Sequence, residues 1–248
     1  NLMFHSSGIG YGTFDQELNP EIGPQAAMAF FDLCDDDPRE HYDQNFVRGG
    51  QVCGGIPLAF TGGPLAWSTT LGSFVPLPAG IPSWGQEFKD FIVRYYSRHF
   101  SISTLMEDLP SESNRIELDL KVTDKWGVPV PRIVYDDHPN TLAMQQFYKM
   151  KVEELFEVAG ANSAVVTIPT IPAGAAAGHV MGTTRMGEDP ERSVANSYGQ
   201  THDVSNLFIG GSSLFVTSAG LNPTLTIFAL SYRTAEQMVK LWRQGAFH

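Results

Sequence analysis

The sequence predicts an α+β fold in which an antiparallel sheet carries helices on one face. Between residues 116 and 122, apolar residues alternate with charged ones, which is typical of a strand with one face on a core and the other in water. Two other segments, near residues 83–95 and 140–159, repeat apolar residues at helical spacing. The 24 glycines and 16 prolines favour many turns and short strands over a helical bundle.

The composition is that of a globular protein. The chain has 248 residues, enough for one large domain or two smaller ones, with 42% hydrophobic and 17% charged residues. A formal net charge of -11 argues against nucleic acid or an anionic membrane surface as the main partner. The sequence has no apolar run long enough for a transmembrane helix, so we expect no membrane span.

Cysteine usage leaves the cellular compartment open. Cys34 and Cys53 are the two cysteines, and the sequence has no His/Cys cluster at metal-ligand spacing, so we expect no metal site. A disulfide between the two cysteines is possible, but we prefer the interpretation of two unpaired thiols.

The first 85 residues give weak signals. Residues 1–5 resemble the middle of a domain, so we expect a fragment, a processed chain or one half of a split protein. One short strand is predicted within residues 1–11, and the acidic residues 35–37 indicate a solvated loop. Residues 54–85 are rich in Gly, Pro and Ser, which is typical of a functional loop or lid, or of a plain surface excursion.

Two helices are predicted from apolar spacing and caps. Ser83 and Gln86 form a capping-box pattern ahead of the first, whose apolar face should pack in the core: Phe88, Phe91, Ile92 and Tyr95. The second spans 140–159, with Asn140 as its cap and Gly160 just after its end. Its apolar positions are Val152, Leu155, Phe156 and Ala159.

Three strands and a turn complete the middle of the chain. Residues 124–127 (DKWG) predict a turn between the alternating strand and a second strand that resumes at 132–135. Pro129 and Pro131 place that second strand at or next to a sheet edge. Residues 163–168 predict another strand, and 169–178 a loop that leads to His179.

The C-terminal segment holds the candidate chemistry. His179 lies in a glycine-bounded turn, and residues 206–209 predict a short buried strand that stops at Gly210–Gly211. Glycines there would let a bulky planar group approach the backbone. Asn222 and Pro223 are suited to the cap and first position of a helix whose N-terminus could face an anion. A structural histidine and a well-capped terminal helix are the simpler alternatives.

Three motifs, in the order in which they occur along the chain, resemble the motifs of a known family. They are HVMGTTRMG from residue 179, NLFIGGS from 206 and NPTLT from 222, and together they are similar to the C-terminal signature of the glucose–methanol–choline (GMC) oxidoreductases. Segments of the middle region, among them DKWGVP from residue 124, resemble substrate-domain strands of that family. The resemblance covers residues 100–245 well and residues 1–99 weakly.

The resemblance implies an FAD enzyme that oxidises a CH–OH group of a sugar, polyol or alcohol. It implies a substrate domain plus the closing strand and helix of a Rossmann-like FAD domain. The division would be a junction segment (1–60), a substrate-binding domain (61–178) and a catalytic and FAD-closing segment (179–248). His179 matches the catalytic histidine and Asn222 the second active-site position. The positions that match the flavin site are Gly211, Ser212, Pro223 and Thr224.

These residue types suit the chemistry. A neutral imidazole can accept the hydroxyl proton near neutral pH while hydride passes to flavin N5. The Asn222 amide cannot act as a base but can orient the hydroxyl, and the helix beginning at Pro223 would stabilise negative charge on the reduced flavin.

One motif of the family is missing. Gly8, Gly10 and Gly12 alternate, but no G-x-G-x-x-G strand-turn-helix unit for the ADP half of FAD follows a strand here. We therefore expect the chain to need an N-terminal FAD-binding half or subunit, and an electron-acceptor partner is possible. The alternative is a non-catalytic binding or structural subunit that keeps the fold. A hydrolase is disfavoured because the sequence has no G-x-S-x-G elbow.

Overall fold

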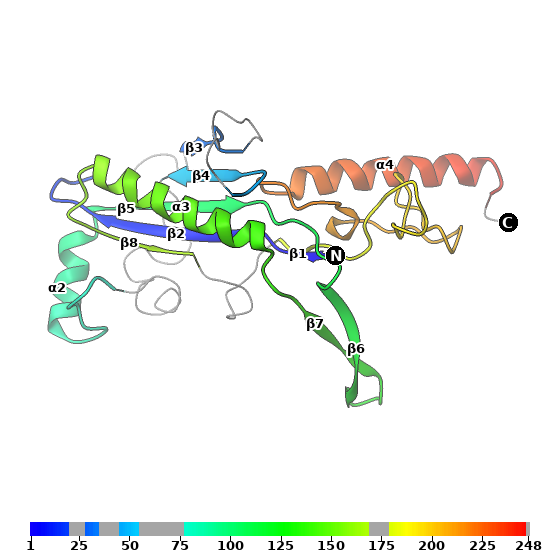
Figure 1. The fold of residues 1–248 in the computed structure, drawn as a ribbon, viewed down its shortest axis with the longest axis horizontal. Helices are drawn as coiled ribbons and strands as arrows, with labels where there is room; N and C mark the ends of the chain where they lie inside the picture. The colour runs from blue at the N-terminus through cyan, green and yellow to red at the C-terminus, as the bar shows by residue number, and fades with distance from the viewer. Residues whose placement is uncertain (20–27, 35–44, 55–76, 169–178, 247–248) are drawn as a thin grey trace. The chain divides into compact units, whose positions relative to one another are not determined.

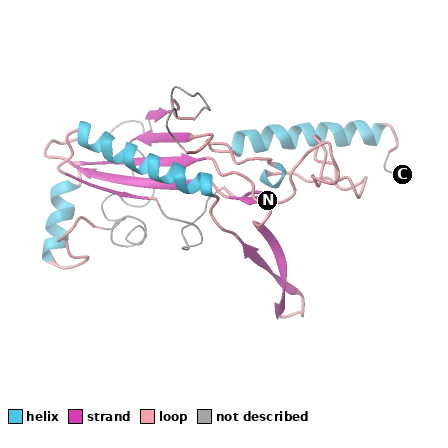
Figure 2. Cartoon of the chain, viewed as in Figure 1, coloured by secondary structure: helices cyan, strands magenta, loops and turns pink. Residues whose placement is uncertain are grey.

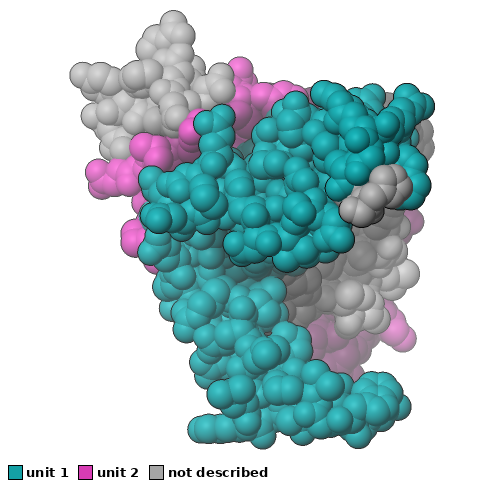
Figure 3. All heavy atoms as spheres, turned by 90° about the vertical axis from the view of Figure 1, so that its right-hand side faces the viewer, with its two compact units in different colours: residues 1–5, 107–138, 176–248 teal, residues 6–106, 139–175 magenta. Residues whose placement is uncertain are grey.

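The computed structural model describes residues 1–19, 28–34, 45–54, 77–168 and 179–246. The predicted loops at 35–37 and 169–178 lie outside these residues, as does most of the predicted lid at 54–85. The described chain divides into two compact units (Figure 3). Unit 1 comprises residues 1–5, 107–138 and 176–248, and unit 2 comprises residues 6–106 and 139–175. The three-segment division given above stays a prediction.

Unit 2 is built on a five-stranded antiparallel sheet (Figures 1 and 2). Its strand order is β3-β4-β5-β2-β8. The strands are β2 (Ser6–Thr13), β3 (Met28–Phe30), β4 (Gly50–Gly54), β5 (His99–Met106) and β8 (Ser163–Thr167). The α+β class and the antiparallel sheet are confirmed, and β8 matches the strand predicted at 163–168.

Helix α3 (Pro139–Val158) covers the face of β2 that carries alternating glycines. A Cβ on Gly10 would lie 2.6 Å from Val152 and 2.7 Å from Phe156, both of which are buried. Because Gly8, Gly10 and Gly12 have no side chains, the helix approaches this part of the strand closely. The Gly8, Gly10 and Gly12 alternation is therefore a packing surface for α3, and the single short strand predicted in residues 1–11 is in fact two strands.

Helix α2 (Gln86–Tyr95) adds cover on the second face of the sheet. Its buried residues Phe88, Phe91 and Ile92 form a cluster with Tyr11, which alternates with the glycines along β2. The sequence predicted helices on one face; α3 fits that prediction, and α2 extends the cover to the other. The apolar face predicted for the first helix is confirmed.

Both predicted helix caps are wrong. The residue at the N-cap of α2 is Gly85, with φ 92°, and no side chain caps the helix, so Ser83 has no such role. Asn140 lies inside the first turn of α3. Its amide bonds the backbone N–H and C=O of Val47 instead, at 2.8 and 3.1 Å. Gly160 does take a left-handed conformation after α3, with φ 77°.

Unit 1 contains two short sheets and a long helix. Strands β1 (Leu2–Met3) and β9 (Met181–Gly182) pair antiparallel, and β6 (Arg115–Thr123) pairs with β7 (Pro129–Val134) as a twisted ribbon (Figure 1). The turn predicted at 124–127 joins β6 to β7, with Gly127 at φ 82°. Helix α4 (Thr224–Arg243) closes the described chain.

The apolar side of the ribbon is exposed. Ile116, Leu118 and Leu120 are 49%, 61% and 85% exposed, although their alternation predicted burial on a core. Their cross-strand neighbours on this face, Ile133 and Pro131, are exposed as well. The two strands were therefore predicted correctly. The prediction that a core covers their apolar face was wrong, because no described element packs on this face.

Two further predictions on unit 1 need correction. Residues 206–209 form an isolated bridge between Phe208 and Gln200 rather than a buried strand, since the described residues offer no neighbouring strand to extend it. Helix α4 begins one residue later than predicted, so Pro223 occupies the cap position and Asn222 precedes it. Cys34 and Cys53 do not form a disulfide with each other, in agreement with the preferred interpretation. In the described part of the chain, every helix is too short or too polar to cross a bilayer.

Candidate active site

Pairing of β1 with β9 brings His5 and His179 together within unit 1. Leu2 lies opposite Gly182 and Met3 opposite Met181. Met3 and Met181 are buried with Phe215, and α4 packs on this cluster through Ile227 and Leu230. The strand pair is thus fixed by apolar burial on α4, and the two histidines follow from its register.

The two imidazoles share a hydrogen bond. His5 Nδ1 lies 2.9 Å from His179 Nδ1, and the rings meet edge to face at a centroid distance of 5.0 Å. His5 is 2% exposed, and its Nε2 lies 2.9 Å from the carbonyl oxygen of Ser218 and 2.5 Å from that of Ala219. His179 is partly exposed. One buried histidine therefore holds one accessible histidine.

Asp108 anchors the residues around His5. Its carboxylate accepts hydrogen bonds from the Phe4 N–H at 3.2 Å and from the Tyr135 hydroxyl at 2.7 Å. Its backbone N–H donates to Ser218 Oγ at 2.6 Å. Asp108 is fully buried, so these bonds compensate the cost of burying a carboxylate. They fix both the backbone that precedes His5 and the serine whose carbonyl holds it.

Burial shifts two titrations in this cluster. It lowers the pKa of His5 below the usual 6.5, and the nearby His179 adds to the lowering, while the Ser218 and Ala219 carbonyls oppose it. Burial also raises the pKa of Tyr135, and the neighbouring Asp108 carboxylate raises it further. The cluster therefore favours a neutral His5 and a protonated Tyr135 hydroxyl.

Three residues other than glycine take left-handed conformations in this region. They are His179 (φ 59°), Thr183 (φ 76°) and Ala219 (φ 57°). Each such residue costs on the order of 1–3 kcal/mol and persists where its surroundings impose it. Here the surroundings include a bond from the Thr183 N–H to the Asn1 carbonyl at 3.1 Å. Strain of this kind is concentrated at functional sites, which marks the His179 turn as a candidate.

Gly211 and Ser212, predicted to face a flavin, start a short 3-10 helix, η3 (Ser212–Leu214). Gly211 has φ 98°, a region open to glycine, and a Cβ placed on it would meet nothing within 4 Å. Backbone bonds from Thr184 to Ser213 (3.1 Å) and from Met186 to Leu214 (3.0 Å) tie this turn to the segment that follows His179. The structure thus brings the two predicted motifs side by side.

Asn222, Pro223 and Thr224 lie at the start of α4. Asn222 and Thr224 are exposed, and Pro223 is buried with its carbonyl accepting the first helical bond, from Ile227 at 2.9 Å. No acidic side chain stands in the first turn, so the positive end of the helix is not neutralised there. In the sequence, Asn222 lies three residues after Ala219, whose carbonyl accepts from His5.

Sequence reasoning missed His5, Asp108, Tyr135 and Ser218. His5 ends the apolar run Leu2–Phe4 in a stretch that gave no periodic signal, and its partner lies 174 residues away. A buried histidine can be recognised from sequence only when its partner strand is known. Here that pairing involves two residues on each strand, which is too short for a pattern.

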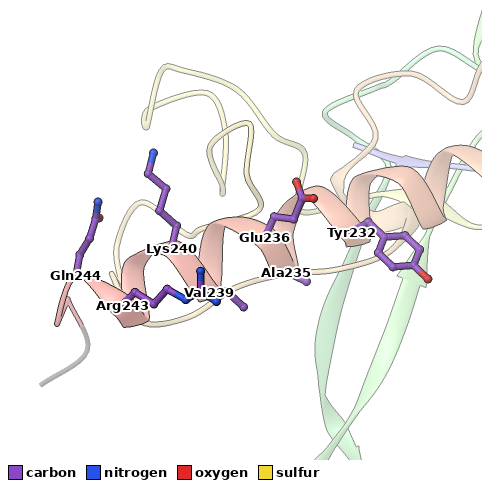
Figure 4. A pocket seen from close by; sticks show the side chains of 7 residues that line it. All are labelled: Tyr232, Ala235, Glu236, Val239, Lys240, Arg243 and Gln244. Carbon is purple, nitrogen blue, oxygen red and sulfur yellow. The ribbon is translucent and has the colours of Figure 1, made fainter.

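Two open grooves of unit 1 lie along α4. One, of about 540 Å³, is lined by Tyr232, Val239 and Arg243 among others (Figure 4). A second, of about 460 Å³, includes Phe208 and Trp242. Neither contains His179 or Asn222. They flank exposed apolar residues of α4 and indicate a surface that another element could cover.

Comparison with known proteins decides the family. Residues 110–231 match the family described as GMC oxidoreductase. These residues belong to the GMC oxidoreductase family. The family predicted from the three C-terminal motifs is confirmed, and the match includes the β6–β7 ribbon, His179, the Gly211 turn and the start of α4.

The relatives that this chain matches are longer than it is. It is 36% identical to 2-methyl-1,2-propanediol dehydrogenase of Mycolicibacterium austroafricanum, over 63% of this chain and 28% of that protein. It is 30% identical to the gluconate 2-dehydrogenase flavoprotein of Pantoea cypripedii, over 95% of this chain and 38% of that protein. The fold is similar to that of pyridoxine 4-oxidase from Mesorbium loti, with a TM-score of 0.54 at 15% identity, over 96% of this chain and 42% of that one.

Proposed function

We propose that this chain is the C-terminal part of an FAD-dependent oxidoreductase that oxidises a CH–OH group of a sugar, polyol or alcohol, with His179 as the base. Membership of the GMC oxidoreductase family supports the reaction class. Relatives named as dehydrogenases of a diol and of gluconate support the substrate class. Because the chain spans 28% and 38% of those relatives, we include an N-terminal FAD-binding half in the proposal.

The observation that carries the proposal is the way His179 is held. Its Nδ1 is engaged by buried His5, while the residue itself is partly exposed. An imidazole anchored at one nitrogen can direct the other toward a substrate hydroxyl. It takes the hydroxyl proton as the carbon-bound hydrogen leaves with its electron pair, so the alcohol loses one proton and one hydride.

Asn222 has an orienting role in this proposal. Its amide offers one acceptor and two donor hydrogens and cannot take up a proton at working pH. It can therefore hold the substrate oxygen and stabilise the negative charge that develops there. Its exposed position just before α4 leaves the side chain accessible to a small molecule.

The residues present suit a flavin. Gly210 and Gly211 leave their faces open, with no heavy atom near a Cβ on Gly211 and the first at 3.9 Å for Gly210. The first turn of α4, which begins at Thr224 and has no acidic side chain, presents backbone N–H groups and the positive end of a helix dipole to an electronegative edge. FAD, when bound, would accept the hydride at its N5. Gly211, Ser212, Pro223 and Thr224 would hold it.

The outer face of α4 supports the need for a second part. Leu225, Phe228 and Tyr232 are 81%, 58% and 74% exposed, and they share one helix face with Val239 and Trp242. So wide an apolar surface is unusual for an isolated protein. In this proposal the FAD-binding half covers it.

The test uses the chain combined with its FAD-binding half. Anaerobic mixing with candidate alcohols, followed by flavin absorbance, gives the rate of flavin reduction. His179→Ala should bind FAD normally and lower that rate by about 10²–10⁴-fold, the usual contribution of a general base. The matched control is His202→Gln, because His202 bonds Ser193 and Gly187 away from the site and should keep the wild-type rate.

Two results would overturn parts of this proposal. An unchanged rate of flavin reduction in His179→Ala would contradict the role of His179 as the base. Stoichiometric FAD retained by the 248-residue chain alone would remove the need for another half. Repeating the assay with oxygen and with a dye as acceptor separates an oxidase from a dehydrogenase.

A further inference from the structure

The positions of both ring nitrogens of His5 determine where its proton lies. Its Nε2 faces two carbonyl oxygens, of Ser218 and Ala219, at 2.9 and 2.5 Å. Carbonyl oxygens only accept hydrogen bonds, so Nε2 must carry hydrogen. In the neutral ring Nδ1 then has a lone pair and can only accept.

Neutrality of His5 follows from its surroundings. The ring is buried, and the titratable group that faces it is His179, which repels a positive charge. The two Nδ1 atoms lie 2.9 Å apart, so a single hydrogen must lie between them. Two hydrogens would clash, and without a hydrogen the two lone pairs would repel each other. With Nδ1 of His5 as the acceptor, that hydrogen belongs to Nδ1 of His179.

We propose that His5 is a positioning residue that fixes His179 in the Nδ1–H tautomer, which leaves the lone pair of His179 on Nε2, the atom free to take the substrate proton. The use of that lone pair rests on the proposed function. The tautomer itself rests on the hydrogen-bond geometry of the two rings and on the burial that keeps His5 neutral. An unrestrained neutral histidine favours the Nε2–H form, in which the outward nitrogen is a donor and cannot act as a base.

The acceptors that hold His5 are themselves built into the fold. Ala219 is left-handed (φ 57°), a conformation that lets consecutive carbonyls of Ser218 and Ala219 converge on one nitrogen. Ser218 is buried and its hydroxyl accepts the Asp108 N–H, while the Asp108 carboxylate accepts the Phe4 N–H. Asp108 thus fixes the backbone that precedes His5 and the serine whose carbonyl accepts from the His5 ring, which is the support a positioning residue needs.

Nitrogen NMR on the 248-residue chain, labelled at histidine, tests the inference without flavin or substrate. Long-range proton–nitrogen couplings should identify wild-type His179 as the Nδ1–H form. His5→Leu removes the acceptor and should return His179 to the Nε2–H form. His5→Gln supplies an acceptor and a donor on one amide and should restore the Nδ1–H form, whereas the control His202→Gln should leave it unchanged.

The two proposals fail separately. Wild-type His179 in the Nε2–H form would overturn the role of His5, whether or not any variant folds. Nδ1–H retained in folded His5→Leu would overturn it too. Nδ1–H in the wild type with an unchanged flavin reduction rate in His179→Ala would overturn the catalytic proposal alone.

With the FAD-binding half present, the role of His5 also predicts a kinetic signature. His5→Leu should lower kcat by about 10–100-fold with KM unchanged, as for other histidines oriented by a second group. His5→Gln should recover most of that loss. A structural defect would not be rescued by an amide of different shape, so equal losses in both variants would contradict the positioning role.

Discussion

Helices α3 and α4 have the same length, 20 residues each, yet they bury very different numbers of side chains. Eight residues of α3 are buried, whereas Thr234 is the buried residue of α4. Helix α3 lies on the glycine face of β2, its own neighbour in unit 2. Helix α4 packs one side on Met3, Met181 and Phe215 and leaves its second apolar side uncovered by described residues. The comparison separates a unit that completes its own core from one that does not.

The largest expected effect contrasts one phenylalanine on each helix. Phe156 on α3 is 1% exposed and Phe228 on α4 is 58% exposed. Phe156→Ala should lower the free energy of unfolding by about 3–5 kcal/mol, because it leaves a cavity against Gly10 and Gly12. Phe228→Ala should change it by less than about 0.5 kcal/mol. Urea denaturation of the chain, followed by circular dichroism, measures both, and similar losses would erase the contrast between the helices.

The second prediction concerns association with the proposed FAD-binding half. Phe228→Asp places a charge in the apolar face of α4 and should weaken that association at least about tenfold, equivalent to about 1.4 kcal/mol. Glu157→Lys, a larger charge change at an exposed position of α3, is the control and should have no effect. Titration of one part with the other gives both affinities. Equal affinity for Phe228→Asp and wild type would mean that another partner covers α4.

The smallest expected effect is a loss of stability of unit 1 at acid pH. Because folding lowers the pKa of His5, the unfolded state binds a proton more readily than the folded state. The contribution of His5 to stability is therefore complete above the ordinary pKa of 6.5 and declines as pH falls below it, by at most about 1.4 kcal/mol per pH unit.

Hydrogen exchange between about pH 5 and 7 can assign this response to one helix. For α4 amides, whose unit contains His5, the difference in exchange rate between wild type and His5→Asn should change with pH. For α3 amides, that difference should stay constant. A pH-independent difference at α4 would contradict a neutral His5, and an equal response at α3 would mean that the two units open together.

The sequence predicted an element of the fold correctly where apolar and polar side chains alternate with the period of that element. The faces of α2 and α3 follow from apolar spacing, and Phe91 and Val152 are buried as that spacing requires. Strand β2 was predicted only as part of one short strand within residues 1–11, because three of its eight residues are glycine and have no side chain to alternate. The ribbon strands were found, but Leu120 shows that alternation predicts an apolar face and not what covers it.

The site was predictable only in part. His179 and the Gly211 turn were found through motifs with fixed spacing, and their roles remain proposals. The caps failed because Gly85 and Pro223 set the helix starts by backbone conformation, which competes with side-chain capping. His5 could not be found, since it depends on Ser218 and Ala219, which are distant in sequence and act through their backbone.

The pairing of β1 with β9 also has a consequence for the order of folding. Residues 6–106 and 139–175, which form unit 2, lie between the two strands along the chain. Closing a loop of that length costs conformational entropy, and the cost falls if the intervening chain has already collapsed. During synthesis β1 also emerges well before its partner. We therefore expect unit 2 to fold first and the two histidines to meet last, so that the His5–His179 pair appears only on a chain whose larger core is already complete.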